Sequence, residues 1–121
     1  MTMPKTVLVA EDDPFFRETI QLKLEEHGVT VRTVTNGEEA IDAIRADQPD
    51  LLLLDLLMPR KDGFSVLAYI RGRSLQFPVV ILSNLLDEID DEKCFSLGAR
   101  EYFLKNEMDE DELWPKVSKY L

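Results

Sequence analysis

Apolar positions along the chain fall into short runs that alternate with longer segments in which apolar residues recur every third or fourth position. Short runs rich in valine and leucine are typical of buried strands, whereas the periodic segments are typical of amphipathic helices. Five strands are predicted, at residues 6–10, 29–34, 50–54, 79–82 and 101–104. The more polar second strand suits an edge of the sheet. Strict alternation with helices predicts an α/β fold around a parallel sheet.

Five helices are predicted, one after each strand. The first begins at Asp13 as N-cap with Pro14 as its first residue, and it ends at Gly28. Its core-facing positions are Phe16, Ile20 and Leu24. Right-handed crossovers place such helices on both faces of the sheet. The pattern therefore predicts a doubly wound, three-layer α/β/α sandwich.

Turn residues delimit the remaining helices. Asn36-Gly37 and Asp62-Gly63 precede the second and third, and Gly98 follows the fourth. The last helix takes in Leu113, Val117 and Leu121. Pro115 falls inside it, where a proline is expected to remove a hydrogen bond and kink the axis.

Composition and charge narrow the class of protein. The 121 residues suit one domain, spanning 1–121, with 45% hydrophobic and 31% charged residues. A net charge of −10 argues against direct nucleic-acid binding, because phosphate backbones repel acidic surfaces. No apolar stretch is long enough to span a membrane, so no membrane association is expected. The single Cys94 cannot form an internal disulfide, which favours a cytoplasmic location.

Two of the apolar runs end in acidic residues. The first strand runs into Glu11, Asp12 and Asp13, and the leucine run of the third strand ends at Asp55. A charge at the end of a buried strand is costly unless something pairs with it. Because ligands of open α/β sheets bind beyond the carboxyl ends of the strands, the acids are expected to share one anionic pocket.

The fourth and fifth strands add Ser83 and Lys105 at the same edge. Crowded carboxylates repel one another and require a cation to stay ionised. Oxygen ligands without a Cys or His cluster favour Mg²⁺. Acids, a metal, a lysine and a hydroxyl around one pocket match the needs of phosphoryl transfer.

These residues resemble the receiver domain of two-component response regulators, a flavodoxin-like family. The resembling segments are VLVAEDD, LLLLDLLMPRKDG, VVILSN and GAREYFLK, in that order across essentially the whole chain. The resemblance implies a five-stranded parallel sheet of order 2-1-3-4-5. It also implies a domain that is phosphorylated by a sensor histidine kinase or a phosphotransfer protein, and that is not a turnover enzyme.

The resemblance also implies a role for each site residue. Asp55 is expected to accept the phosphoryl group, with Lys105 and Ser83 binding its oxygens. Mg²⁺ is expected to be held by Asp12, by Asp55, by the backbone carbonyl of Leu57 and, through water, by Glu11. Tyr102 corresponds to the switch aromatic, which fills the space that Ser83 vacates. The output is a repacked fourth-helix and fifth-strand face, which acts on a downstream effector domain or target protein. A homodimer through the fourth-helix, fifth-strand and fifth-helix face is a further possibility.

Two positions depart from the family pattern. Asn106 stands where a proline usually follows a cis peptide bond, and a cis bond before a non-proline residue costs about 2.5–4 kcal/mol. The loop is therefore expected either to differ or to be strained. Asn84 replaces a usually small residue, and it could narrow access to Asp55 or bond the phosphoryl group. Leu57 and Leu85 flank the expected approach of hydrolytic water and are predicted to prolong the phosphorylated state.

Other residues have simpler interpretations. Asp13 is read as a structural N-cap, His27 as a partner of the first helix's C-terminal dipole, and Cys94 and Trp114 as packing residues.

Three alternative functions fit parts of the sequence less well. A receiver-like interaction module that works without phosphorylation is slightly favoured by Asn84 and Asn106, but disfavoured by the intact Asp12, Asp55 and Lys105. A flavin carrier would need a small polar phosphate loop after the first strand. An aspartate-based phosphatase would usually carry a second acid at position 57, which is leucine.

Overall fold

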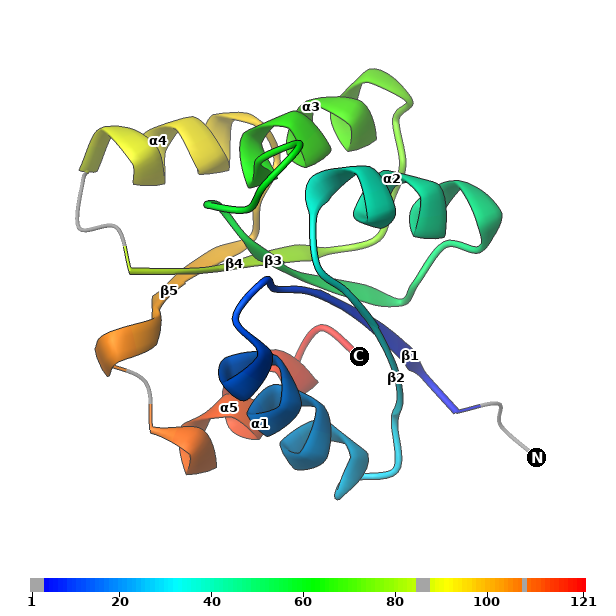
Figure 1. Cartoon of the computed structure of the whole chain (residues 1–121), viewed down its shortest axis with the longest axis vertical. Coiled ribbons are helices and arrows are strands. Elements are labelled where there is room, and N and C mark those ends of the chain that lie inside the picture. The colour runs from blue at the N-terminus through cyan, green and yellow to red at the C-terminus, as the bar shows by residue number, and fades with distance from the viewer. Residues whose placement is uncertain (1–3, 85–87, 108) are drawn as a thin grey trace.

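The sheet has the predicted strands and the predicted order (Figure 1). The computed structural model describes residues 4–84, 88–107 and 109–121. Within them, five parallel strands lie in the order β2-β1-β3-β4-β5. The strands are β1 (Thr6–Ala10), β2 (Thr30–Val34), β3 (Leu51–Asp55), β4 (Val79–Ser83) and β5 (Glu101–Leu104). The third and fourth each reach one residue further than predicted, so Asp55 and Ser83 belong to their strands.

Helices follow every strand, as predicted. They are α1 (Pro14–Glu25), α2 (Gly37–Ala46), α3 (Gly63–Gly72), α4 (Glu88–Ser96) and α5 (Leu113–Ser118), with short 3-10 turns at Lys105–Glu107 and Glu110–Glu112. The predicted N-cap Asp13 is confirmed, and the predicted turn residues Asn36 and Asp62 also serve as N-caps. The side chains of Asp13, Asn36 and Asp62 accept hydrogen bonds from backbone N–H groups in the first turns of α1, α2 and α3. These bonds satisfy donors that a helix start otherwise leaves unpaired.

The three-layer arrangement follows from the alternation of side chains along the strands. On β3, Leu52 and Leu54 face the core formed with α2, α3 and α4, whereas Leu51 and Leu53 face the core formed with α1 and α5. Figure 1 shows α2, α3 and α4 on one side of the sheet and α1 and α5 on the other. Because every residue of the leucine run packs against one layer or the other, the run needs no polar face.

The register of the sheet aligns the ends of the central strands. Ala10 of β1 lies beside Leu54 of β3, and Ser83 of β4 lies beside Leu104 of β5. The next residue on each of β1, β3 and β5 is Glu11, Asp55 and Lys105, respectively. The carboxyl edge therefore gathers the polar residues that the sequence analysis singled out.

The C-terminal segment departs from prediction. Pro115 is the third residue of α5 and lies in its first turn, because the preceding residues form a separate 3-10 turn. The N–H groups of a first helical turn have no intrahelical acceptor, so Pro115 removes no hydrogen bond there. The expected loss of a hydrogen bond was wrong. The helix also ends at Ser118, so Leu121 packs against the core from outside it.

His27 lies just after α1 and has a partner that the sequence did not indicate. Its ring stacks on Trp114 with centroids 4.3 Å apart and planes 2° from parallel. The stack joins the end of α1 to α5, and Trp114 packs against the core on that side, as predicted. Cys94 is buried in the opposite core, also as predicted. None of the described helices combines the length and apolar character needed to cross a bilayer.

The start of α2 carries a carboxylate whose charge stabilises the fold. Thr35 donates its backbone N–H and its hydroxyl to Glu39 Oε1, at 2.7 and 2.8 Å, and these bonds lower the pKa of Glu39. A lowered folded pKa stabilises the protein above the unfolded value of about 4.3, and the contribution is lost as the pH falls through the folded value. Because Glu39 is exposed, solvent screens its charge, and we expect Glu39→Gln to reduce the free energy of unfolding by no more than about 0.5 kcal/mol at pH 7.

The same linkage predicts that this difference shrinks as the pH falls below about 4. Urea unfolding of the parent protein and of Glu39→Gln at a series of pH values measures this difference in the free energy of unfolding. A difference that stayed constant with pH would mean that the Glu39 charge has no part in the effect.

Candidate functional site

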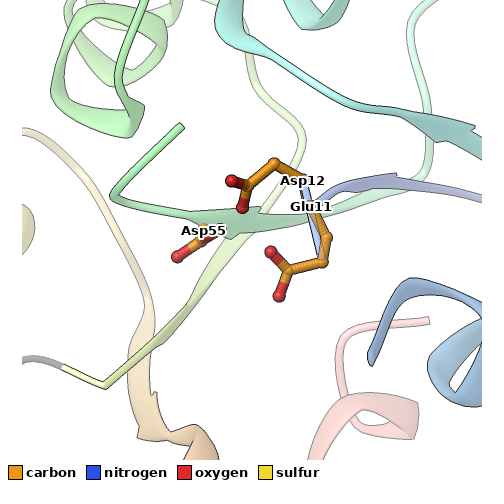
Figure 2. A group of neighbouring side chains, drawn as sticks. All are labelled: Glu11, Asp12 and Asp55. Atoms are coloured by element: carbon orange, nitrogen blue, oxygen red, sulfur yellow. The ribbon is translucent and has the colours of Figure 1, made fainter. Parts of the chain in front are cut away.

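Three carboxylates meet at the carboxyl edge of the sheet (Figure 2). Glu11 and Asp12 follow β1 and Asp55 ends β3, and one oxygen of each lies within 4.8 Å of the others. Glu11 and Asp55 are buried, whereas Asp12 is exposed. Two buried acids lie beside an exposed one, so the predicted clustering of these three residues is confirmed. This acid cluster, together with Lys105, is called the acidic pocket below.

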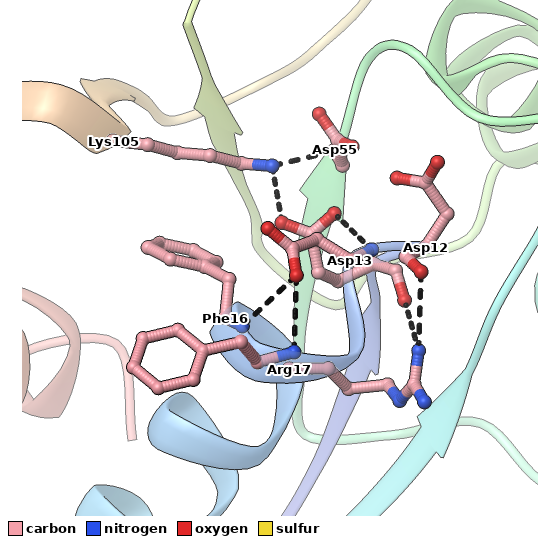
Figure 3. A network of polar contacts seen from close by, with 8 residues as sticks. Asp12, Asp13, Phe16, Arg17, Asp55 and Lys105 are labelled. Carbon is pink, nitrogen blue, oxygen red and sulfur yellow. Dashed lines mark hydrogen bonds and ion pairs between the residues drawn. The ribbon is translucent and has the colours of Figure 1, made fainter.

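Lys105 enters the pocket from β5 (Figure 3). Its ammonium group forms ion pairs with Glu11 Oε1 and with Asp55 Oδ2, the latter at 3.3 Å. The side chain is only 12% exposed. One lysine facing three acids leaves an excess of negative charge, which a cation would neutralise.

Burial and mutual repulsion shift the acids away from their ordinary behaviour. Burial raises the pKa of Glu11 to about 8, Asp55 adds to the rise, and Lys105 partly offsets it. Burial also raises the pKa of Asp55, against the opposing effects of Glu11 and Lys105. Raised carboxylate pKa values indicate that the pocket holds its full negative charge poorly by itself. Such perturbed groups are typical of functional sites.

The turn between β1 and α1 is held by its own side chains. Asp13 Oδ1 accepts hydrogen bonds from Phe15 N (3.0 Å) and Phe16 N (3.4 Å), which confirms its role as N-cap. Arg17 Nη1 donates to the carbonyl oxygens of Glu11 (3.0 Å) and Asp12 (3.4 Å). Asp13 therefore fixes the helix start, and Arg17 fixes the backbone that carries the acids (Figure 3).

The other described residues that were predicted for the site lie on β4, just after β4, on β5 and after β3. Ser83 is buried at the end of β4, and Asn84 after it is exposed. Tyr102 is half-buried in β5 and packs against the core on the α4 side. Leu57 follows β3 with its side chain 60% exposed. Leu85 falls outside the described residues.

The segment after β5 differs from the family pattern. Lys105–Glu107 form a 3-10 turn, and no peptide bond among the described residues is cis. Asn106 was expected either to change this loop or to strain it, and the structure shows a changed loop.

Three contacts at the site were not predicted from the sequence. Arg17 clamps two carbonyl groups that no side-chain pattern reveals. Phe16 was assigned only to the core, yet its ring also faces Lys105 Nζ, 4.9 Å from the ring centroid. Gly63 N–H donates to Leu56 O at 2.9 Å, which places α3 against the end of β3. A positive residue one turn after an N-cap is the signal that could have pointed to Arg17.

The strand order and the acid cluster define a flavodoxin-like α/β domain with three neighbouring carboxylates at its switch-point edge. The family model described as the response regulator receiver domain matches residues 7–118. The chain therefore belongs to the response regulator receiver domain family, and it is the receiver domain of a two-component response regulator.

Known relatives agree with this assignment. The alkaline phosphatase synthesis transcriptional regulatory protein PhoP of Bacillus subtilis is 35% identical over 103 residues, which are 85% of this chain and 43% of that protein. The chain thus spans less than half the length of this curated relative. The Francisella response regulator 1452 receiver domain superposes with a TM-score of 0.89 at 32% identity, covering 96% of this chain and 95% of that one. The phosphorylated cyanobacterial phytochrome response regulator RcpA has a TM-score of 0.84 at 33% identity, covering 97% and 91%.

Proposed function

We propose that Asp55 accepts a phosphoryl group from a sensor histidine kinase or a phosphotransfer protein, and that the resulting aspartyl phosphate switches the output face of the domain. The observation that carries this proposal is a buried carboxylate that faces one lysine and two further acids at the sheet edge. The relative RcpA, described as phosphorylated, supports it by its similarity.

The donor set fits Mg²⁺. Carboxylate oxygens of Asp12 and Asp55 lie close together, without a Cys or His cluster among the described residues of the pocket. Mg²⁺ binds through one or two carboxylates and keeps several waters. Asp12, Asp55 and the Leu57 carbonyl would hold the ion, and Glu11 would assist through water. When bound, the ion would neutralise charge on the carboxylate and on the phosphoryl oxygens.

The chemical step is a nucleophilic transfer. An Asp55 oxygen forms a bond to phosphorus as the phosphorus–nitrogen bond of the donor phosphohistidine breaks, and the electron pair stays on the imidazole nitrogen. Lys105 already contacts Asp55, so its ammonium group is placed to pair with a phosphoryl oxygen. The Ser83 hydroxyl would donate to another oxygen.

The new dianionic charge then shifts a conformational balance. Movement of Ser83 toward the phosphoryl group opens space for Tyr102, and the α4–β5 face repacks. A small free-energy change is sufficient when two states lie within a few kcal/mol of each other. The altered face would bind a downstream effector domain or target protein, or a second copy of the chain through α4, β5 and α5.

The proposal extends to the whole chain. We take residues 1–121 as one receiver unit that resides in the cytoplasm, modifies itself without turning over a separate substrate, and binds no nucleic acid directly. The phosphorylation-independent module is not favoured, because Asp12, Asp55 and Lys105 are assembled in one pocket.

Intact-mass measurement tests the proposal. The chain is incubated with Mg²⁺ and a small phosphodonor, and then with a cognate kinase if the small donor is excluded by Asn84. We expect the mass of one added phosphoryl group in the parent and none in Asp55→Asn. Asp13→Asn is the matched control, since asparagine also caps helices and the substitution removes an acid beside the pocket without touching Asp55.

A parent protein that gains no phosphoryl group from either donor would overturn the proposal and favour the unphosphorylated module. Equal uptake by Asp55→Asn would place the acceptor elsewhere.

The exposed Leu57 side chain gives a separate prediction. If it excludes hydrolytic water, Leu57→Asn should speed dephosphorylation about tenfold, equivalent to about 1.4 kcal/mol in the barrier. Its 60% exposure means that the folded state should tolerate the change. The half-life of the phosphorylated protein, followed by phosphate release, measures the effect. An unchanged half-life would remove Leu57 from the account of water exclusion.

A further inference from the structure

Lys105 has a third neighbour besides its two acids. Its ammonium nitrogen lies over the ring of Phe16, 4.9 Å from the centroid, while it also pairs with Glu11 and with Asp55 (Figure 3). An aromatic face attracts a cation electrostatically, through the negative charge above and below the ring. Lys105 is thus bounded by carboxylates and by a π face, with little access to solvent.

We propose that Phe16 is a positioning residue for phosphorylation: its ring holds the Lys105 ammonium group beside Asp55. The inference rests on the function proposed above. Glu11 competes with Asp55 for the same ammonium group, and a lysine chain has many rotamers. A fixed aromatic face restricts those rotamers without forming a hydrogen bond that the phosphoryl group would have to break.

The backbone around Phe16 is built to keep the ring in place. Phe16 lies in the first turn of α1, where its N–H donates to Asp13 Oδ1 at 3.4 Å. The half-buried ring packs against the core that contains Ile20 and Leu24. Arg17, the next residue, ties this turn to the carbonyl of Glu11. The ring and the acids are therefore carried by one hydrogen-bonded turn.

A simpler role for Phe16 would be to fill space in the core. A leucine at this position would also fill space, but it lacks the charge distribution of an aromatic ring. Ring fluorination separates the two roles, because it weakens the attraction for a cation and changes the shape little. If Phe16 only fills the core, fluorination should leave the phosphorylation rate unchanged. If its ring attracts Lys105, the rate should fall further with each added fluorine.

The experiment uses the full chain with mono-, di- and trifluorinated phenylalanine at position 16. We expect the rate constant for phosphorylation by a small phosphodonor, at saturating Mg²⁺, to fall progressively with fluorine number, by about tenfold in total. The matched control is the same series at Phe103, whose ring lies 4.8 Å from Lys116 Nζ and outside the pocket. That series should leave the rate unchanged.

A second readout needs no phosphorylation. In the unmodified protein, NMR signals of the Lys105 side-chain terminus should show a ring-current shift that Phe16→Leu removes and Phe16→Tyr retains. Absence of this shift would overturn the inference. A rate that Phe16→Leu lowers but fluorination does not would also overturn it, and would leave Phe16 as a packing residue.

The two proposals can fail separately. If the parent protein takes up no phosphoryl group, the proposed function is overturned. The role of Phe16 in phosphorylation is then overturned as well, even when the ring-current shift is present. A parent that is phosphorylated at a rate independent of the ring's electronics overturns only the role of Phe16.

Discussion

Replacing Lys105 by methionine is expected to slow phosphorylation of Asp55 by at least about a hundredfold, the effect of removing one well-placed donor from the site of developing charge. Methionine keeps the length and apolar stem of the side chain but cannot pair with Asp55 or with a phosphoryl oxygen. The rate constant for phosphorylation by a small donor at saturating Mg²⁺ measures the loss.

The affinity for Mg²⁺ should not fall with the phosphorylation rate in Lys105→Met. Removing the positive charge leaves Glu11, Asp12 and Asp55 without an internal counter-ion, so a divalent cation should bind at least as tightly. Titration calorimetry measures this affinity in both proteins. A slower rate that came with an equal loss of Mg²⁺ affinity would mean that Lys105→Met had disrupted the pocket as a whole.

The matched control for this prediction is Lys119→Met. Lys119 also pairs with a β5 carboxylate, that of Glu101, but at the start of the strand. The variant has the same change in net charge, and we expect its phosphorylation rate to match that of the parent. A comparable slowing in Lys119→Met would trace the effect to net charge, not to the pocket.

Replacing Gly63 by alanine is expected to impair both the fold and the site. A Cβ at Gly63 would lie 2.5 Å from Asp55 O and 2.8 Å from Leu56 Cα, both backbone atoms. Neither atom can turn away as a flexible side chain would, so α3 must shift from the end of β3. We expect the free energy of unfolding to fall by about 1–3 kcal/mol. Phosphorylation should slow as well, because the displaced backbone carries Asp55.

Gly72→Ala is the control for this substitution. Gly72 ends the same helix, and a Cβ there would meet no atom within 4 Å. Alanine should stabilise the helix slightly, by up to about 1 kcal/mol. Urea unfolding and phosphorylation rates of both variants separate a clash from a general loss of glycine. If Gly63→Ala unfolded no more easily than Gly72→Ala, the close approach of α3 to β3 would be in doubt.

Sequence patterns predicted most of the fold because each element carries its own local signal. The leucine run of β3 is apolar at every position, which is compatible only with a strand covered on both faces. Asp13, Asn36 and Asp62 precede α1, α2 and α3 and bond their first turns, so these boundaries were predictable from single residues. The C-terminal helix was predicted less well, because the 3-10 turn before Leu113 follows from packing rather than from a turn motif.

The candidate site was predictable in its members but not in its contacts. Parallel strands bring their carboxyl ends to one edge, so Asp55 and Lys105 could be assigned to one pocket from their positions alone. That Glu11 pairs directly with Lys105 could not be predicted, because a side chain's partner depends on rotamers and distances between strands. The same limit hid the ring of Phe16 over the ammonium group and the Arg17 clamp.

What the sequence by itself determined, then, is the alternation of strands and helices, most helix starts and the set of acids at the strand ends, since these depend on residues near one another in the chain. Only the tertiary structure decided which acid pairs with the lysine, how close α3 comes to Asp55, and where His27 and Pro115 fit. Those features depend on close packing between elements distant in sequence, where differences of an ångström determine whether groups bond or clash.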